Sequence, residues 1–391
     1  MARMKNLYYI THMDNVPSIL KQGILSHERV VAEEIPFTRI YNEEIVANRR
    51  EIRLPDGRTL WSFANIYFQP RNAMLFKVKS DMGNEKFTNN IAILAVRRDV
   101  LDRDDIFVST GNAAHSASII LPATEGRKFI PQIRKDTDKD YWNDEDGSKR
   151  KMMAECLVPD TVAPEYIQGI YVASHDAVDK MRAMVPQLKV NVVPEPKMFF
   201  QPLKEIRLTP YLTVIEGDMF FSKMQTLTVS VNCVGVMGKG LASRAKYQFP
   251  RVYVFYQDLC RKRKLQMGKP YLYKLESSID YQLADEPSTL SNAESETWFL
   301  MFPTKQHWRD RADVNGIEKG LQWLRDNYEK EGIKSLAVPA LGCGLGKLDW
   351  RDVGPLLCRY LKNLQIPAQI YLPAETKVPD ELLSPDFLLG T

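Results

Sequence analysis

Apolar runs alternate with longer amphipathic stretches through the second half of the chain. Short runs rich in Val, Ile, Leu and Phe recur there, and segments with helical spacing lie between them. Strands that alternate with helices in this way are typical of an α/β fold. The predicted strands span residues 212–215, 227–231, 298–302, 335–338 and 368–372.

The first half also contains strand-like runs, but they are separated by longer polar stretches. Asp14 is expected to cap a helix that begins at Val16 and stops at Gly23. A polar stretch over residues 39–53 has a helical pattern, and a densely charged stretch over residues 134–151 is expected to be exposed. Strands are predicted over residues 7–10, 91–96, 152–159 and 167–172, and a helix over 177–184.

Prolines mark the change between the two halves. Pro194, Pro196 and Pro202 lie within a short stretch, and a new strand begins at Leu212. Such a proline-rich segment is typical of a linker between domains. The pattern predicts one domain over residues 1–205 and a second over residues 206–391.

Two glycine-rich loops follow predicted strands in the second half. The first, residues 232–242, reads NCVGVMGKGLA, and the second, residues 339–346, reads PALGCGLG. Glycine lets the backbone approach a ligand closely, and N–H groups at the start of a helix favour negative charge. Two such loops at corresponding strand ends predict a pocket that holds a diphosphate from both sides.

Composition limits the class of protein but does not indicate a binding partner. The chain has 391 residues, a net charge of +4 and 44% hydrophobic residues, as expected for a globular protein of two or three domains. Its five cysteines form no CxxC pair, so neither a disulfide framework nor a structural zinc site is expected. The start lacks the apolar core of a signal peptide and no apolar run is long enough to span a membrane, so a cytoplasmic protein is expected.

Several polar residues of the first half lie at positions where a catalytic or ligand-binding role is expected. Glu155 interrupts an apolar strand, and a buried carboxylate must be paired or functional. His12 is expected at a strand-to-helix turn, where local hydrogen bonding or a ligand contact would explain it. His115 lies in a loop of small residues, and Arg71 follows an aromatic strand. Arg49, Arg50 and Arg53 form either a solvated face or a cluster that binds phosphate or base.

The second half resembles a macrodomain, the ADP-ribose-binding fold, over most of residues 210–375. The resemblance implies a three-layer α/β/α fold with a mixed sheet. It also implies that Asp218 contacts the adenine. The implied ADP-ribose contacts in the two loops are Asn232, Gly238, Gly240, Gly342, Gly344, Leu345 and Gly346.

The motif FPTKQHW, residues 302–308, is similar to the macrodomain branch that contains the DarG antitoxins and the terminal ADP-ribose glycohydrolases. In that branch the lysine at the position of Lys305 attacks or polarises the C1″ atom of the distal ribose. Such a role suits a flexible amine that loses its proton when desolvated. Some relatives carry an aspartate where Gly346 stands here, so Lys305 is expected to act without that helper.

The first half resembles the DarT single-stranded DNA ADP-ribosyltransferases over roughly residues 5–205. The matching motifs are ITHMDNVPSIL at residues 10–20, YFQPRNAML at 67–75 and AECLV at 154–158, although Tyr9 stands where many relatives have a histidine. The resemblance implies an α+β fold that uses NAD as substrate and needs no metal. The implied NAD contacts are Thr11, His12, Asn15 and Arg71.

The same resemblance implies catalytic roles. Glu155 would bond to the nicotinamide-ribose hydroxyl and stabilise the transition state, and His115 would lie near the reacting base. Arg50 would assist proton loss from the base, with Arg49 and Arg53 as alternatives.

The two halves together predict a toxin–antitoxin fusion. The first half would attach ADP-ribose to a base of single-stranded DNA, the second would hydrolyse it off, and the two would contact each other within the molecule. One alternative is a catalytically silent module that binds ADP-ribosylated nucleic acid or protein. Another is that RNA or protein is the acceptor.

Overall fold

The computed structural model describes residues 6–40, 46–81, 88–285 and 296–390. The described residues form two compact units. The first contains residues 1–200 together with 280–292, and the second contains residues 201–279 and 293–391. A short segment from the second half of the sequence is therefore part of the first unit. The functional boundary near residue 205 stays a prediction.

The first unit is built on an eight-stranded sheet in the order β10-β9-β4-β1-β3-β7-β5-β6. All neighbours pair antiparallel except β9 with β10, so the predicted α+β class is confirmed. The strands are β1 (Asn6–His12), β3 (Phe63–Tyr67), β4 (Ile91–Arg97), β5 (Phe107–Ser109), β6 (Ile120–Pro122), β7 (Glu155–Pro159), β9 (Ile167–Val172) and β10 (Asn191–Pro194).

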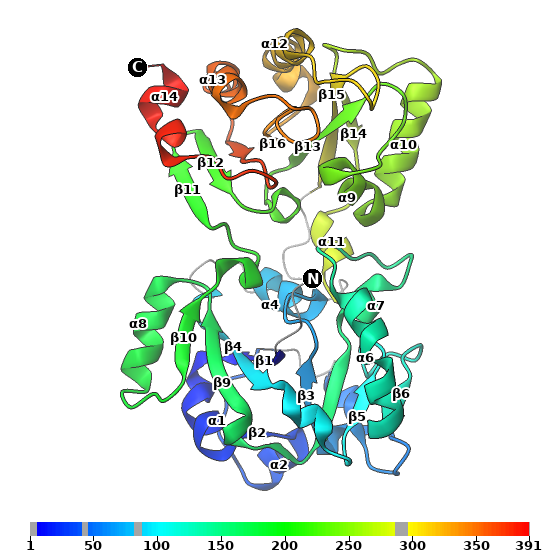
Figure 1. The fold of residues 1–391 in the computed structure, drawn as a ribbon, viewed down its shortest axis with the longest axis vertical. Helices are drawn as coiled ribbons and strands as arrows, with labels where there is room; N and C mark the ends of the chain where they lie inside the picture. Colours follow the sequence, from blue (N-terminus) through cyan, green and yellow to red (C-terminus); the bar gives the residue numbers. More distant parts are fainter. Residues whose placement is uncertain (1–5, 41–45, 82–87, 286–295, 391) are drawn as a thin grey trace. The chain divides into compact units, whose positions relative to one another are not determined.

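Helices and short strands surround this sheet (Figure 1). The helices are α1 (Val16–Gln22), α2 (His27–Ala32), α4 (Ala73–Asp81), α6 (Ala123–Thr137), α7 (Ser148–Met152) and α8 (His175–Met184), and β2 (Ile24–Leu25) pairs with β8 (Thr161–Val162). The core gathers apolar side chains such as Leu7, Leu94 and Cys156, all fully buried. Burial of these alternating strand residues stabilises the sheet.

Two helix predictions for the first unit differ from the structure. The expected cap by the Asp14 side chain is wrong: the N-cap of helix α1 is Asn15, whose side chain makes no capping hydrogen bond, and the Asp14 carboxylate instead accepts from Thr38 Oγ1 at 3.4 Å. Of the polar helix expected over residues 39–53, residues 46–50 are helical and end in the 3-10 helix η2 (Asn48–Arg50), whereas residues 39–40 and 51–53 are not helical. Residues 41–45 lie outside the described residues.

The charged stretch over residues 134–151 was predicted to be exposed, but part of it is buried. Trp142, Asn143 and Lys149 are buried in it. Two of them bind the segment that the second half contributes: Trp142 Nε1–H donates to Leu283 O at 2.9 Å, and Lys149 Nζ donates to Ala284 O at 3.0 Å. Buried donors of this kind need such partners, and the segment supplies them.

The second unit is built on a seven-stranded mixed sheet in the order β11-β12-β17-β16-β13-β15-β14. The five central strands are parallel and the two edge strands antiparallel. The strands are β11 (Lys204–Arg207), β12 (Leu212–Glu216), β13 (Thr226–Asn232), β14 (Tyr271–Lys274), β15 (Trp298–Lys305), β16 (Leu336–Pro339) and β17 (Ala368–Tyr371).

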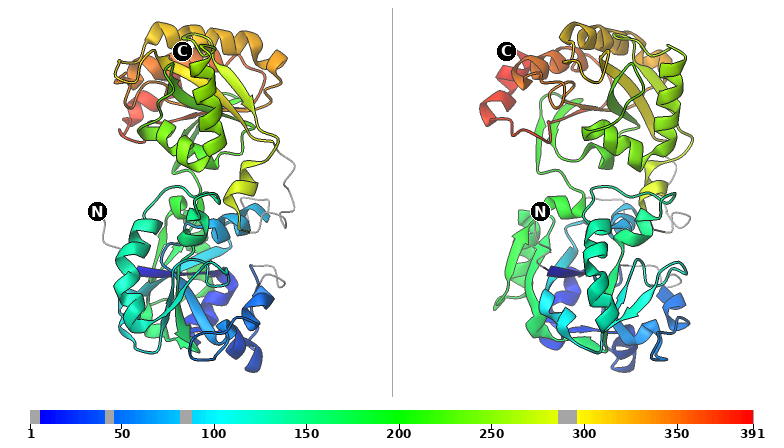
Figure 2. Two further views of the ribbon diagram at one scale, coloured as in Figure 1. Left: turned by 90° about the vertical axis from the view of Figure 1, so that its right-hand side faces the viewer. Right: turned by 45° about the vertical axis from the view of Figure 1, so that its right-hand side comes forward.

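Helices cover both faces of this sheet, which confirms the predicted three-layer α/β/α fold. Helices α9 (Gly240–Gln248) and α10 (Pro250–Arg261) lie on one face, and α12 (Val314–Glu331) and α13 (Trp350–Leu361) on the other (Figures 1 and 2). The central strands are buried on both faces, which explains their continuous apolar sequences. All five predicted strands are confirmed, whereas the edge strands β11 and β14 were not predicted.

Two short helices complete the chain. Helix α11 (Ile279–Leu283) lies almost wholly in the segment that belongs to the first unit, and α14 (Pro385–Leu389) packs beside α13. No helix among the described residues is long and apolar enough to cross a membrane.

Candidate functional site

Glu155 is the buried carboxylate of the first unit. It is the first residue of β7 and is fully buried. Its two carboxylate oxygens each lie 3.0 Å from Arg49 Nη2, and Oε1 also accepts the backbone N–H of Ala113 at 3.0 Å. These hydrogen bonds satisfy the buried carboxylate and hold it in one orientation.

Arg49 pairs with Glu155, whereas Arg50 does not. Burial would lower the pKa of Arg49, but the Glu155 carboxylate outweighs it and raises that pKa. The guanidinium of Arg50 instead lies 4.4 Å from the centre of the Trp61 ring, and His27 stacks on that ring at 4.6 Å. Burial, Arg49 and Arg50 lower the pKa of His27 to about 4, so this imidazole is neutral at pH 7. The assignment of Arg50 to base deprotonation stays a prediction.

Tyr67 lies beside Glu155 in the sheet and was not identified from the sequence. The register of β3 and β7 pairs the two residues directly. Burial, and secondly the Glu155 charge, raise the pKa of Tyr67 far above its usual range. Its hydroxyl therefore keeps its proton and can donate a hydrogen bond. The one sequence signal that could have identified Tyr67 was its place in the YFQPR motif.

The loop that holds His115 crosses the end of β7. Ser109 Oγ accepts the backbone N–H of Glu155 at 3.0 Å and donates to Gly111 O at 2.6 Å, so these two bonds connect the loop to β7. His115 is exposed, and its Nδ1 accepts the N–H of Ala117 at 3.0 Å. A neutral His115 therefore carries its proton on Nε2. The structure brings the loop to Glu155 and leaves the His115 ring at its surface.

The predicted NAD contacts lie further along β1. Tyr8 is in register with Tyr67. His12 lies four residues further along β1, about 13 Å from Tyr8. His12 is buried, and burial first and Lys180 second lower its pKa although Asp14 opposes them. Its Nδ1 accepts a backbone N–H, which leaves Nε2 protonated in the neutral ring.

Thr11 and Asn15 form one local network. Asn15 Nδ2 donates to Thr11 Oγ1 at 3.0 Å and to Thr38 O at 2.8 Å, and Asn15 Oδ1 accepts the N–H of Thr38 at 2.7 Å. Asn15 therefore holds the segment around Thr38 against the end of β1.

Arg71 lies after β3, with its guanidinium 4.8 Å from the centre of the Phe200 ring and its Nε–H bonded to Lys197 O at 3.1 Å. The neighbouring Asn72 is fully buried and caps α4 by accepting the N–H of Leu75.

In the second unit the two glycine loops converge at one edge of the sheet. Loop 1 (residues 232–242) follows β13 and loop 2 (residues 339–346) follows β16, and these strands are parallel neighbours. A Cβ atom added to Gly240 would lie 3.6 Å from Leu345 Cδ1 and 3.6 Å from a Glu375 carboxylate oxygen. An added Cβ at Gly344 would lie 3.2 Å from the same carboxylate. The predicted convergence of the loops is therefore confirmed.

Asn232 shapes loop 1 from within. Its Oδ1 accepts the N–H of Val234 at 3.0 Å, and its Nδ2 donates to Val236 O at 2.6 Å. The hydroxyl of Tyr256 also lies 2.9 Å from Oδ1. Asn232 thus folds the loop that carries Gly238 and Gly240 before helix α9. Whether it also contacts a ligand stays a prediction.

Asp218 lies just after β12 and caps a short turn by accepting the N–H of Phe220. Its other oxygen pairs with Arg244 of α9 at 2.6 Å. The side chain predicted to contact adenine is therefore oriented by a neighbouring cation.

Loop 2 leaves no room for a side chain at Gly346. A Cβ atom there would lie 2.4 Å from Gly342 O and 2.7 Å from Ala312 Cβ, far closer than real contacts allow. Gly342 has a φ of +78°, which favours glycine. The aspartate that some relatives carry at this position has no space here.

Lys305 ends β15 beside loop 1, in register with Asn232. Its Nζ donates to Asp310 O at 2.9 Å and to Leu345 O at 3.2 Å. Burial lowers the pKa of Lys305; Asp310 opposes this and Lys347 adds to it. The amine therefore loses its proton more readily than a free lysine, next to loop 2.

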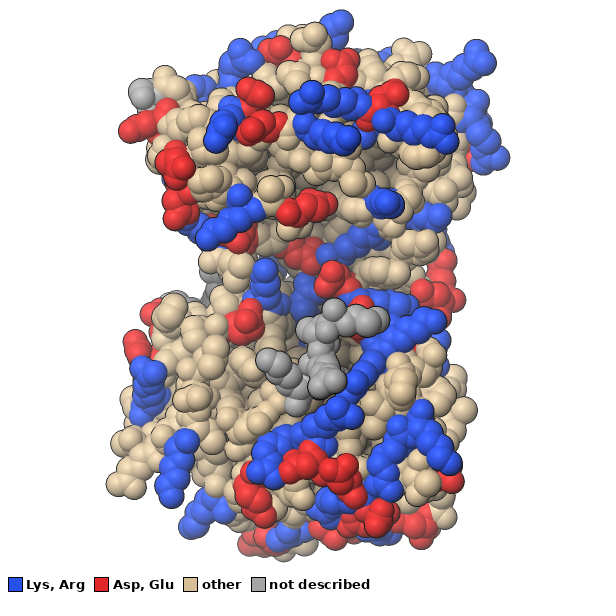
Figure 3. Space-filling model, in the orientation of Figure 1, with Lys and Arg blue, Asp and Glu red and all other residues tan. Residues whose placement is uncertain are grey.

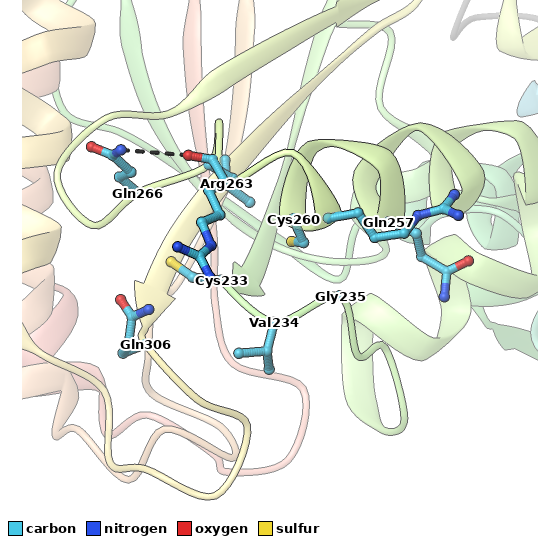
Figure 4. A pocket seen from close by; sticks show the side chains of 10 residues that line it. Cys233, Val234, Gly235, Gln257, Cys260, Arg263, Gln266 and Gln306 are labelled. Atoms are coloured by element: carbon cyan, nitrogen blue, oxygen red, sulfur yellow. Dashed lines mark hydrogen bonds between the residues drawn. The ribbon is translucent and has the colours of Figure 1, made fainter.

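A hollow of about 620 Å³ lies between loop 1 and helix α10 (Figure 4). Cys233 and Cys260 line it with Gln257, Arg263 and Gln306. Burial raises the pKa of Cys233 to about 11, so this thiol remains protonated and unreactive at pH 7. No group of three or more His, Cys, Asp or Glu side chains among the described residues could hold a metal ion.

Comparison with known proteins identifies the family. Residues 8–200 match the family of DarT single-stranded DNA thymidine ADP-ribosyltransferases, and residues 292–357 match the macro domain. A DNA ADP-ribosyl transferase–DNA ADP-ribosyl glycohydrolase fusion protein of Thermosipho africanus is 55% identical over 389 residues, covering 100% of this chain and 99% of that protein. The chain belongs to the DarTG fusion family. It is an ADP-ribosyltransferase joined to an ADP-ribosyl glycohydrolase.

Other comparisons support the DarTG assignment. The solved structure of Thermosipho africanus DarTG in complex with ADP-ribose has a TM-score of 0.92 and 54% identity, and covers 98% of this chain and 100% of that one. A DNA ADP-ribosyl glycohydrolase of Mycobacterium tuberculosis is 34% identical over 161 residues, covering 41% of this chain and 42% of that protein. The predicted family and fold of both halves are thus confirmed.

Proposed function

We propose that the first unit transfers ADP-ribose from NAD to a base of single-stranded DNA, and that the second unit hydrolyses ADP-ribose from that base. Both reactions take place in the cytoplasm. Thymine is the first base to test, because the matching family is described as acting on thymidine.

Buried Glu155, held by Arg49 and the Ala113 N–H, supports the transferase role most directly. As the bond between nicotinamide and C1″ of the ribose breaks, positive charge develops on the ribose ring. An oriented carboxylate stabilises that charge and accepts a bond from the ribose hydroxyl. A base nitrogen then bonds to C1″ and releases its proton, assisted by Arg50 or His115. The NAD contacts are Thr11, His12, Asn15 and Arg71.

The position of Lys305 beside two converging glycine loops supports the glycohydrolase role. N–H groups of Gly238, Gly240, Gly342 and Gly344 would hold the diphosphate, and Asp218 the adenine. The Lys305 amine, with its lowered pKa, would act on C1″ as the bond to the base breaks. Water supplies the oxygen that ends on C1″, and the base takes back a proton.

Mass spectrometry of oligonucleotides tests both activities. We expect the Lys305→Ala protein, given NAD and a single-stranded oligonucleotide, to accumulate a product heavier by one ADP-ribose. The Glu155→Ala protein should leave the oligonucleotide unmodified and should remove ADP-ribose from the product of the first reaction. A Lys305→Ala protein that adds no mass would contradict the transferase proposal. A Glu155→Ala protein that removes none would contradict the glycohydrolase proposal.

A further inference from the structure

A second hollow, of about 460 Å³, lies beside the Lys305 amine. Arg309, Asp310, Arg311, Leu345 and Lys347 line it. Two of these, Asp310 and Leu345, supply the carbonyl oxygens to which Lys305 Nζ donates. A group released or held at Lys305 therefore faces this hollow.

The side chains around the hollow favour an anion. Three of the five lining residues are cations and one is an acid. The acid, Asp310, turns back into its own loop, where Oδ2 accepts the N–H of His307 at 2.9 Å. Lys and Arg side chains also gather on the visible face of the second unit, the upper part of Figure 3. Phosphates are the anions that such a cluster binds well.

An exposed tryptophan accompanies the cations. Trp308 is 46% exposed although it is the largest apolar side chain of its turn. The Arg309 guanidinium lies 4.6 Å from the centre of its ring. Cations that follow a backbone, together with an aromatic face for the bases, are the features that bind single-stranded nucleic acid.

The turn that carries these residues is held in place. Asp310 N donates to His307 O at 3.0 Å, Ala312 N to Gly346 O at 3.0 Å, and Arg311 Nη2 to Lys347 O at 3.1 Å. The backbone of the turn is therefore bound to loop 2, which fixes the positions from which its side chains extend. Preformed surfaces of this kind lose less entropy on binding.

We propose that Trp308, Arg309, Arg311 and Lys347 form a strand cradle that binds the single-stranded DNA on either side of the modified base. Trp308 stacks on a neighbouring base, and the three cations contact phosphates. This inference rests on the proposed glycohydrolase function and adds that the second unit recognises the strand as well as the ADP-ribose.

The test compares two substrates on full-length protein that carries Glu155→Ala. One substrate is an ADP-ribosylated oligonucleotide made with the Lys305→Ala protein, and the other is the ADP-ribosylated mononucleotide cut from it by nuclease. We expect Trp308→Ala and Arg309→Gln to raise KM for the oligonucleotide about tenfold and to leave KM for the mononucleotide within about twofold. Tyr247→Ala, at an equally exposed aromatic position of the same unit, and Arg325→Gln are the matched controls.

A binding measurement keeps the cradle testable even without hydrolysis. The Lys305→Ala protein is titrated with the modified oligonucleotide and with free ADP-ribose, and a separate titration with the unmodified oligonucleotide measures the binding that does not depend on ADP-ribose. The extra affinity of the oligonucleotide should fall in the Trp308 variant. In a plot of the logarithm of the binding constant against the logarithm of the salt concentration, the slope should become smaller by about 0.7 for each cation removed.

The outcomes separate the two proposals. If the Glu155→Ala parent hydrolyses neither substrate, the glycohydrolase function fails, and the binding measurement still decides on the cradle. If Trp308→Ala weakens both substrates equally, or neither, and does not reduce the extra affinity of the strand, the cradle is overturned.

Discussion

Among single residues, Arg49 has the clearest structural role. The sequence offered three arginines for the first active site and the resemblance favoured Arg50, but only Arg49 contacts Glu155. Sequence alone does not separate neighbours in an arginine-rich stretch, because their spacing predicts the same exposure for each. The pairing depends on which guanidinium reaches β7 in the folded chain.

The Arg49–Glu155 pair leads to a stability prediction. Arg49→Ala leaves a buried, unpaired carboxylate and should lower the free energy of unfolding by about 3–5 kcal/mol. Arg50→Ala loses only a contact with Trp61 and should cost about 0.5–1 kcal/mol. Urea unfolding of both variants measures the difference. Equal losses would show that the ion pair does not stabilise the first unit.

A second residue-scale prediction concerns the pH dependence of hydrolysis. In the proposed hydrolysis Lys305 acts as an unprotonated amine, and Lys347 helps to keep its pKa low. Lys347→Met should raise that pKa, so the acidic limb of the pH–rate profile should move to higher pH. The ADP-ribosylated mononucleotide is the suitable substrate, and Lys330→Met, in the last turn of α12, is the control. A shift to lower pH, or none, would contradict this role of Lys347.

At the scale of elements, the backbone of loop 2 explains why this chain carries no acid at position 346. The backbone of Gly342 approaches Gly346 too closely for any side chain. Gly346→Asp should therefore move loop 2 instead of adding a catalytic acid, and should reduce hydrolysis about a hundredfold or more, since misplacing a site by about 1 Å has that effect. Gly169→Ala, where an added Cβ makes only ordinary contacts, is the control. An unchanged or faster rate would contradict the steric argument.

The same loops show what a pattern of elements can predict. Parallel strands bring their carboxyl ends to one edge of a sheet, so loops after β13 and β16 were expected to meet once an α/β fold was recognised. The register that pairs Asn232 with Lys305 was not predictable, because it includes a β-bulge after Val231. The role of Trp308 was also missed, since its motif identified the family without showing that its ring is exposed.

At the scale of the whole molecule, the two units do not coincide with the two halves of the sequence. Residues 280–292 belong to the first unit. Leu283 and Ala284 are fully buried there, and Asp285 N donates to Ala73 O at 3.2 Å. A fragment cut at residue 205 therefore lacks part of the first unit.

This arrangement predicts that a residue late in the sequence stabilises the first unit. Leu283→Ala should lower the free energy of unfolding by about 2–5 kcal/mol through the cavity it leaves. Hydrogen exchange should report the loss in residues 142–149 of the first unit, which bind the segment. Leu203→Ala, at an exposed position, is the control. Unchanged protection of residues 142–149 would contradict this role of the segment.

The amino-acid sequence by itself determined the α/β and α+β classes, the central strands and the two glycine loops, and it indicated Glu155 and Lys305 as candidate catalytic residues. These follow from local periodicity, from glycine at loop positions, and from motifs that lie close together in the chain. Only the tertiary structure decided which arginine pairs with Glu155, that Tyr67 lies beside it, that Gly346 has no room for a side chain, and that residues 280–285 pack in the first unit. Each of these depends on contacts between residues far apart in sequence, and local patterns carry no information on such distances.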